Sequence, residues 1–194
     1  MWLAVAGEVC LVIALGLCAW RCGRLRPEAR TPFWPLLLAG ALAFIAINAA
    51  TGALRYAGVD AVVPLHLQLT TVSVGWMMPL YLVAALRIWG KLPGKVLACW
   101  LVLALLPAVS ALPGLLRDAM LVLALLRLLQ QAPARLNLTQ ALALLLAVPL
   151  SSLLPLGEDA ALGLFHLLLA GHFYAFYRAV AVLCATRLAS KKAQ

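Results

Sequence analysis

Long apolar runs alternate with short polar gaps along the whole chain. A helix needs about 20 mostly apolar residues to cross the ~30 Å hydrocarbon core of a bilayer. Seven runs are predicted to be such helices, and they cover residues 2–20, 34–54, 61–86, 96–112, 114–132, 138–157 and 160–186. The pattern therefore predicts an all-α, polytopic membrane protein with a single seven-helix transmembrane domain.

The charged residues in the gaps predict which side of the membrane each gap faces. All fifteen Lys and Arg residues except Arg55 and Arg117 can be placed on one side, whereas four of the six acids, Asp60, Asp118, Glu158 and Asp159, fall on the other. Lys and Arg concentrate in cytoplasmic loops, so the N-terminus is expected outside and the C-terminus in the cytoplasm of a bacterial-type inner membrane. The segment 96–132 either crosses as a hairpin or is re-entrant, and both alternatives leave the later topology unchanged.

Composition agrees with this class and excludes others. The chain is 66% hydrophobic and 11% charged, whereas about a quarter of the residues of a soluble domain are charged. The net charge of +9 is spread over short gaps with no soluble basic domain, so it does not indicate nucleic-acid binding. The expected partners are membrane lipids, including anionic lipids of the cytoplasmic leaflet.

Polar residues inside the predicted helices form the candidate site. Such side chains are costly in lipid and therefore usually face other helices. They gather in the outer third of four helices, and the predicted ligand-binding set is Asn48, Thr51, Arg55, His66, Thr70, Ser73 and His166. Glu8 lies at a similar depth in the first helix and joins His66 and His166 as candidate catalytic residues. Arg55 is expected to pair with Asp60 or to bind an anion such as a lipid phosphate.

Three interpretations of this set remain open: a hydrogen-bonded packing network, an outward-facing ligand pocket, and a metal or acid–base site. Catalytic zinc usually takes three converging protein ligands. His166 and His172 are six residues apart, about 240° around a helix, so they cannot share one site. A metal would need Glu8, His66 and His166, and no sequence motif supports that set. No cofactor is predicted, with zinc on His166 as the alternative, and His172 is expected to be a buried, hydrogen-bonded ring.

Three further features concern packing. A stripe of small residues in the second helix is predicted to contact a neighbouring helix, and it consists of Ala39, Ala43, Ala46, Ala50 and Ala53. Pro79 and Pro149 lie inside predicted helices, where each should cause a kink. The five cysteines are expected to be free thiols, since none lies in an outer loop and no C-x-x-C pair occurs.

The last helix carries a resemblance to a known family. The run from Leu162 to Leu168, with Phe165 before His166, resembles the H-x-x-x-H-L-L motif of the CREST superfamily, seven-helix membrane proteins that include the alkaline ceramidases. The aromatic stretch 173–178 and the segment 51–56 are similar to further pieces of that pattern. The resemblance implies the seven-helix fold and a zinc site of three histidines.

The chain departs from the family motif at the other two histidine positions. The first histidine of the helix-seven motif is Leu162 here, and the helix-two histidine is replaced by Arg55 or Tyr56, depending on the alignment. Only His166 carries over as a ligand, and Thr51 stands where the family has a serine. The sequence therefore favours a non-catalytic membrane protein that binds a lipid or small apolar ligand. The alternative is a membrane-embedded, metal-assisted lipid amide or ester hydrolase of CREST type.

Overall fold

The computed structural model describes residues 2–25, 33–89, 123, 126–127, 129–130 and 135–192. Within these ranges every regular element is a helix, which confirms the all-α prediction for them. The α-helices are α1 (Trp2–Gly23), α2 (Phe33–Tyr56), α3 (Val63–Val72), α4 (Met78–Trp89), α7 (Arg135–Leu150) and α8 (Glu158–Lys192). Three short elements, η2 (Asp60–Val62), η3 (Ser73–Met77) and η4 (Ser151–Leu153), adjoin them.

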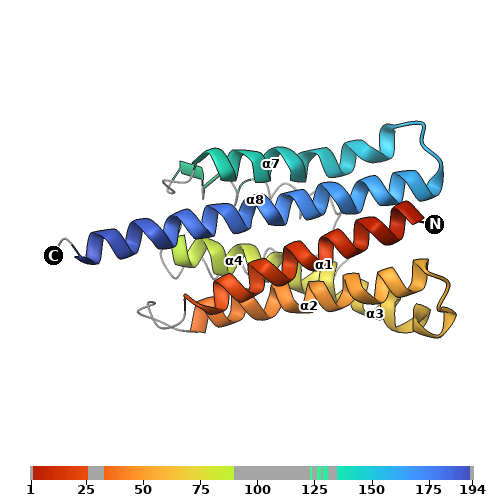
Figure 1. The fold of residues 1–194 in the computed structure, drawn as a ribbon, viewed down its shortest axis with the longest axis horizontal. Helices are drawn as coiled ribbons and strands as arrows, with labels where there is room; N and C mark the ends of the chain where they lie inside the picture. The colour runs from red at the N-terminus through yellow and green to blue at the C-terminus, as the bar shows by residue number, and fades with distance from the viewer. Residues whose placement is uncertain are drawn as a thin grey trace.

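The helices lie side by side in one elongated bundle (Figure 1). Helix α1 packs between α2 and α8, α7 packs on α8, and the α3–α4 segment packs on α2. The start of α1, the turn from α2 to α3 and the turn from α7 to α8 lie at one end of the bundle, whereas α8 ends at the other (Figure 1). The beginning of α1 and the end of α8 therefore lie at opposite ends of the bundle.

Four segments are long and apolar enough to cross a membrane: Trp2–Gly23, Phe33–Tyr56, Asp60–Ile88 and Glu158–Leu183. Each coincides with a predicted helix. Together with α7 they account for five of the seven predicted helices. The predicted helices 96–112 and 114–132 lie outside the described residues, apart from single positions in the second.

The prediction for the sixth helix, 138–157, is wrong at its C-terminal end. Helix α7 ends at Leu150, one residue after Pro149, and continues only as the 3₁₀ turn η4. A proline removes a backbone donor and disfavours the helical conformation of the residue before it, so the helix stops close to this position although the sequence stays apolar. The hydroxyl of Ser151 donates to the Val148 carbonyl oxygen at 2.7 Å and caps the helix end.

Pro79 does not break its helix, because a π turn precedes it. In a regular α-helix the proline ring would clash with the carbonyl of Gly75. Residues Ser73–Met77 instead form the π-helical element η3, in which the N–H of Met78 donates to the Ser73 carbonyl. The wider turn moves the carbonyl groups away from the ring and joins α3 to α4 in one continuous segment.

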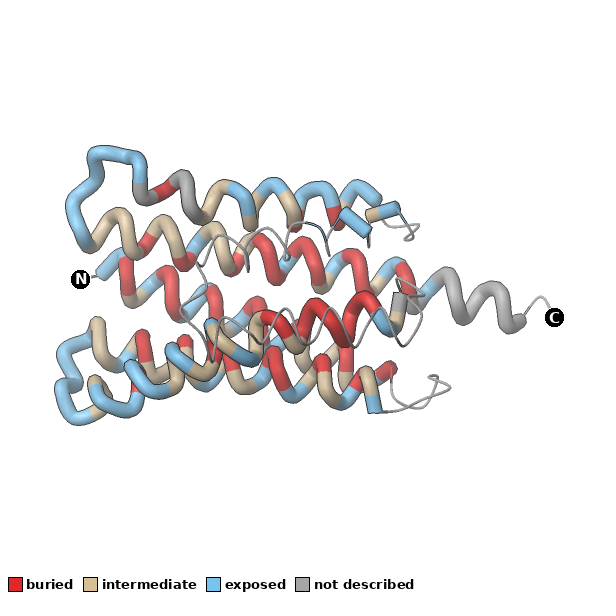
Figure 2. The backbone as a smooth tube through the Cα atoms, turned by 180° about the vertical axis from the view of Figure 1, so that it is seen from behind, coloured by how far each residue is buried: buried red, intermediate tan, exposed pale blue. Residues whose placement is uncertain are grey.

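The core is centred on α4 (Figure 2). Six consecutive residues, Tyr81–Leu86, are buried, so this helix is enclosed on all sides. Leu15 and Phe173 belong to the same core cluster. Large apolar side chains such as Ile13 (57% exposed) cover the outer surface, as expected for helices that face lipid.

Glycines, rather than the predicted alanine stripe, bring α1 and α8 close together. A Cβ on Gly7 of α1 would lie 2.8 Å from the Gly163 carbonyl oxygen of α8, so the two backbones touch. The prediction for α2 holds only in part: Ala39 and Ala46 pack against the core, whereas Ala43 is exposed. The face that α2 buries consists of Pro35, Leu38, Ala41, Leu42, Ile45, Ala49 and Gly52. In a helix that is apolar all round, the spacing of small residues does not determine which face packs.

Candidate functional site

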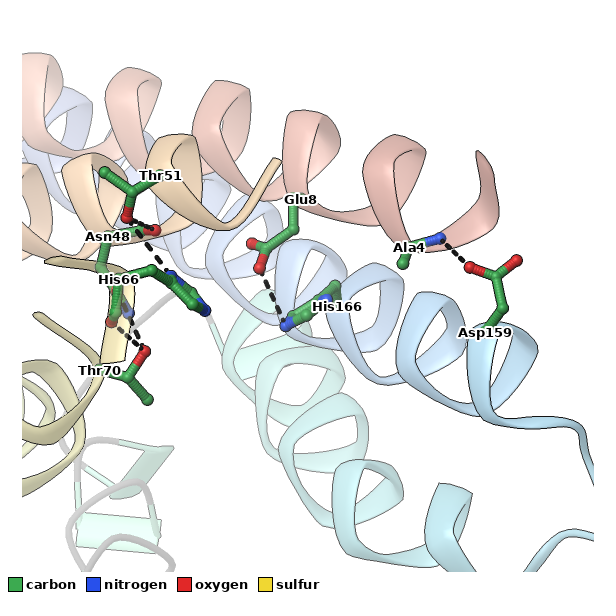
Figure 3. Close-up of polar contacts among 8 residues, drawn as sticks. All are labelled: Ala4, Glu8, Asn48, Thr51, His66, Thr70, Asp159 and His166. Carbon is green, nitrogen blue, oxygen red and sulfur yellow. Dashed lines mark hydrogen bonds and ion pairs between the residues drawn. The ribbon is translucent and has the colours of Figure 1, made fainter. Parts of the chain in front are cut away.

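The centre of the candidate site is a contact between Glu8 of α1 and His166 of α8 (Figure 3). Glu8 Oε1 lies 3.3 Å from His166 Nε2, and the two residues are 2% and 8% exposed. The glycine contact between the helices positions this pair, because a Cβ on Gly7 would lie 2.9 Å from the Cβ of His166. Glu8 and His166, which are far apart in the sequence, are thus in contact in the buried interior of the bundle.

At Gly52, α2 lies against both Glu8 of α1 and His66 of α3. A Cβ added to this residue would overlap the Glu8 carboxyl group and lie 3.0 Å from Cε1 of His66. The carboxyl group therefore occupies the space that a larger residue would fill, directly beside the second imidazole. The structure brings Glu8, His66 and His166 together, as the depth of these residues in the sequence predicts.

The hydrogen bonds of His66 determine which of its nitrogens carries the proton. The Thr51 hydroxyl donates to the Asn48 carbonyl oxygen at 2.7 Å, and a carbonyl only accepts. The contact of 3.3 Å between Thr51 Oγ1 and His66 Nδ1 therefore has the imidazole as donor. In the neutral ring Nε2 is then left as an acceptor. Figure 3 shows this ring pointing from α3 toward the Glu8–His166 pair.

Two more of the predicted residues complete a network between α2 and α3. The Thr70 hydroxyl lies 2.8 Å from the His66 carbonyl oxygen and 3.2 Å from Asn48 Oδ1. Asn48, Thr51, His66 and Thr70 are thus joined by hydrogen bonds (Figure 3). This network holds the His66 ring in place.

The end of α2 adds an aromatic ring and a cation. The Tyr56 ring centroid lies 6.1 Å from that of His66 and 6.2 Å from that of His166. The Arg55 guanidinium lies 5.3 Å from the centroid of the same tyrosine ring. The expected pairing of Arg55 with Asp60 does not occur among the described residues, because the guanidinium stacks on Tyr56 instead.

Two buried polar atoms have no hydrogen-bond partner among the residues that the structure describes: His166 Nδ1 and Ser73 Oγ. Ser73 lies in η3 and is not joined to the network of Asn48, Thr51, His66 and Thr70, although its spacing in the sequence predicts that it belongs there. Buried polar atoms without partners are uncommon in folded proteins and are costly in lipid. The unpartnered nitrogen of the His166 imidazole therefore lies in the same residue that contacts the buried Glu8 carboxyl group.

No group of three or more His, Cys, Asp or Glu residues within the described ranges has an arrangement that could hold a metal ion. In the geometry observed, His166 Nε2 faces Glu8, so these two groups contact each other. Cys10, Cys18 and Cys22 are free, as predicted for these three.

Other polar contacts are structural. His172 is buried and hydrogen-bonded, as predicted: its Nδ1 lies 2.8 Å from the Ala141 carbonyl oxygen and its Nε2 lies 2.7 Å from the Tyr81 hydroxyl. Nδ1 therefore donates and Nε2 accepts from Tyr81, which satisfies the ring completely. At the start of α1, Asp159 Oδ1 accepts a hydrogen bond of 3.4 Å from the Ala4 N–H (Figure 3).

The residues that sequence reasoning missed are Gly7, Gly52 and Tyr56. Gly52 and Tyr56 carried only the family resemblance as a signal, and Gly7 carried none, because its role depends on which helix lies opposite. Comparisons of the chain with protein-family models, with curated proteins and with solved structures find no match.

Proposed function

We propose that this chain is an integral membrane protein that binds a lipid or a small apolar ligand and holds its polar group at the cluster of Glu8, His66 and His166. The observation that carries this proposal is the buried, unpartnered Nδ1 of His166 beside a carboxyl group that is 2% exposed. Ionisable groups inside membrane helices are retained where they serve a substrate, an ion or a counter-ion. A bound polar group would complete the cluster.

The proposed topology has seven membrane-spanning helices, with the N-terminus outside and the C-terminus in the cytoplasm of a bacterial inner membrane. Trp2 and Trp20, both exposed, are about 27 Å apart along α1, which suits two interfacial aromatic positions. Arg21 and Arg87 lie in the last turns of α1 and α4, toward the end where α8 finishes. Reporter fusions at the two termini test this topology, and active reporters in the same compartment would contradict it.

Ligand binding is tested by lipid analysis of the purified protein. We expect a bound lipid or apolar molecule to co-purify with the wild type and with the control variant Thr71→Val, whose exposed hydroxyl only contacts its own helix. The variant His166→Phe should fold but lose the molecule, because the ring nitrogens that complete the cluster are absent. Retention of the same molecule by His166→Phe would overturn the proposal.

The second candidate is a metal-assisted lipid hydrolase related to the CREST superfamily. It is favoured by one observation: His66 donates its Nδ1 proton to Thr51, in the way that metal-ligating histidines are usually oriented by an outer partner. Metal analysis separates the candidates. Stoichiometric zinc that is lost in both His66→Ala and His166→Ala would favour the hydrolase, whereas metal-free, folded wild-type protein would favour ligand binding.

A further inference from the structure

The Glu8 carboxyl group is the acidic centre of the cluster. Glu8 is 2% exposed, and among the described residues its carboxyl group has one ion-pair or hydrogen-bond partner, Nε2 of His166. A buried carboxylate whose partner is a single neutral imidazole is strongly unfavourable at membrane depth, so the group keeps a proton unless a cation pairs with it. A cation bound beside Glu8 would replace this proton and stabilise the carboxylate.

The hydrogen-bonding groups around Glu8 suit a cation that donates protons. His66 Nδ1 donates to Thr51, so the free Nε2 of the neutral ring is an acceptor, as is the carboxylate. The face of the neighbouring Tyr56 ring also attracts cations. A primary ammonium group has three N–H donors and one positive charge, and it matches this set of acceptors.

The same end of the bundle also offers a group for an anion. The Arg55 guanidinium rests on the Tyr56 ring at 5.3 Å and pairs with no carboxylate among the described residues. Guanidinium groups bind phosphate through two parallel hydrogen bonds. The Tyr56 ring at the end of α2 thus neighbours both the acceptor cluster and the guanidinium. Two exposed apolar side chains, Leu54 and Leu65, are adjacent in sequence to Arg55 and His66.

We propose that this end of the bundle binds the head group of an ethanolamine phospholipid, with the ammonium on Glu8 and His66 and the phosphate on Arg55. This inference rests on the proposed lipid-binding function and specifies its ligand class. The acyl chains lie along the apolar surface that carries Leu54 and Leu65. The ammonium and the phosphate of the head group are close neighbours, as are the two sets of protein groups around Tyr56.

The test is a comparison of lipids that differ only in the head group. The full chain in detergent micelles is titrated with phosphatidylethanolamine, phosphatidylcholine or phosphatidylglycerol of identical acyl chains, and bound lipid is counted by native mass spectrometry. We expect the ethanolamine lipid to bind about tenfold more tightly than the choline lipid, because trimethylation removes all three N–H donors but keeps the charge and the phosphate. Equal affinity for the three lipids would overturn the proposal, as would equally tight binding of soluble phosphoethanolamine.

Variants of the protein test which residue binds the ammonium group and which binds the phosphate. Glu8→Gln should abolish the preference for ethanolamine over choline, whereas Arg55→Gln should weaken both lipids to a similar degree. Arg178→Gln, a control on the exposed surface of α8, should change neither. If Glu8→Gln fails to fold, Gly52→Ala replaces it, since its Cβ would displace the Glu8 carboxyl group. An unchanged preference in the variant that folds would refute the site.

Failure of the head-group assignment is distinguishable from failure of the proposed function. If a lipid of another class binds and is lost in His166→Phe, lipid binding at the cluster stands and the ethanolamine assignment is overturned. If no lipid of any class responds to His166→Phe or Glu8→Gln, both are overturned.

Discussion

The close contact between α1 and α8 leads to a quantitative prediction for Gly7→Ala. The added Cβ would lie 2.8 Å from the Gly163 carbonyl oxygen and 2.9 Å from the Cβ of His166. Ordinary contacts of this kind begin near 3.4 Å, so the two helices would have to separate by about half an ångström. Backbone atoms cannot rotate away as a flexible side chain can, and the separation would loosen the packing along both helices.

The magnitude follows from two opposing effects. Overpacking of a well-packed contact costs about 1–3 kcal/mol. Alanine has a higher helix propensity than glycine by about 1 kcal/mol, which offsets part of that cost. We therefore expect Gly7→Ala to lower the free energy of unfolding by up to about 2 kcal/mol. The matched control is Gly16→Ala on the same helix, where the added Cβ meets nothing within 4 Å, so stability should be unchanged or slightly raised.

Unfolding by sodium dodecyl sulfate in detergent micelles, followed by circular dichroism, measures the difference between these variants. Gly163→Ala should also destabilise, since its Cβ would lie 2.8 Å from the Leu3 carbonyl oxygen. The double variant Gly7→Ala with Gly163→Ala should cost less than the sum of the two, because one separation of the helices relieves both clashes. If Gly7→Ala is as stable as Gly16→Ala, the backbones of α1 and α8 do not meet at these glycines.

The remaining predictions concern the buried side chains. Tyr81→Phe removes the donor to His172 Nε2 and should lower the free energy of unfolding by about 0.5–1.5 kcal/mol in the same assay. Tyr174→Phe, on the exposed surface, should leave it unchanged, and equal values for the two variants would contradict the assigned hydrogen bond. In single-cysteine variants, a lipid-soluble maleimide should label Cys10, which is exposed on the outer surface of α1, in the folded protein, but should label buried Cys18 only after unfolding. Equally rapid labelling of both in the folded protein would contradict the assigned face of α1. The nitrogen-15 spectrum of histidine-labelled protein should show the proton of His66 on Nδ1, and a proton on Nε2 would remove the acceptor that the ammonium site needs.

Sequence reasoning identified the helices better than their packing. The ranges 2–20, 34–54, 61–86 and 160–186 each fall within one observed helical segment, because a bilayer imposes a minimum apolar length that composition reveals directly. The end of the sixth predicted helix was missed, since the apolar run continues to residue 157 while the α-helix ends at Leu150, one residue after Pro149. Apolar character alone does not report this local steric effect.

The candidate site was predictable in part for a similar reason. Polar groups that cannot face lipid must face the bundle, so depth alone grouped Glu8 with His66 and His166. The partners of each group were not predictable, because they depend on how the helices are rotated about their axes. Gly52 and Tyr56 became recognisable only when α2 was seen against α1 and α3. The alanine stripe was only partly right for the same reason, since Ala39 and Ala46 pack but Ala43 does not, and no single-sequence pattern selects among several apolar faces.

The π turn Ser73–Met77 contains one residue more than a regular α-helical turn needs at this position. Deleting one residue there would restore the ordinary repeat and leave both halves of the segment facing their present neighbours, His66 toward Glu8 and Tyr81 toward His172. The remaining cost would be a kink where the Pro79 ring meets the carbonyl group four residues before it. The same deletion elsewhere in the segment would rotate one half by about 100° and separate one of these pairs. A gene that loses a single codon is therefore expected to survive such an event at this turn more readily than at any other point of the segment.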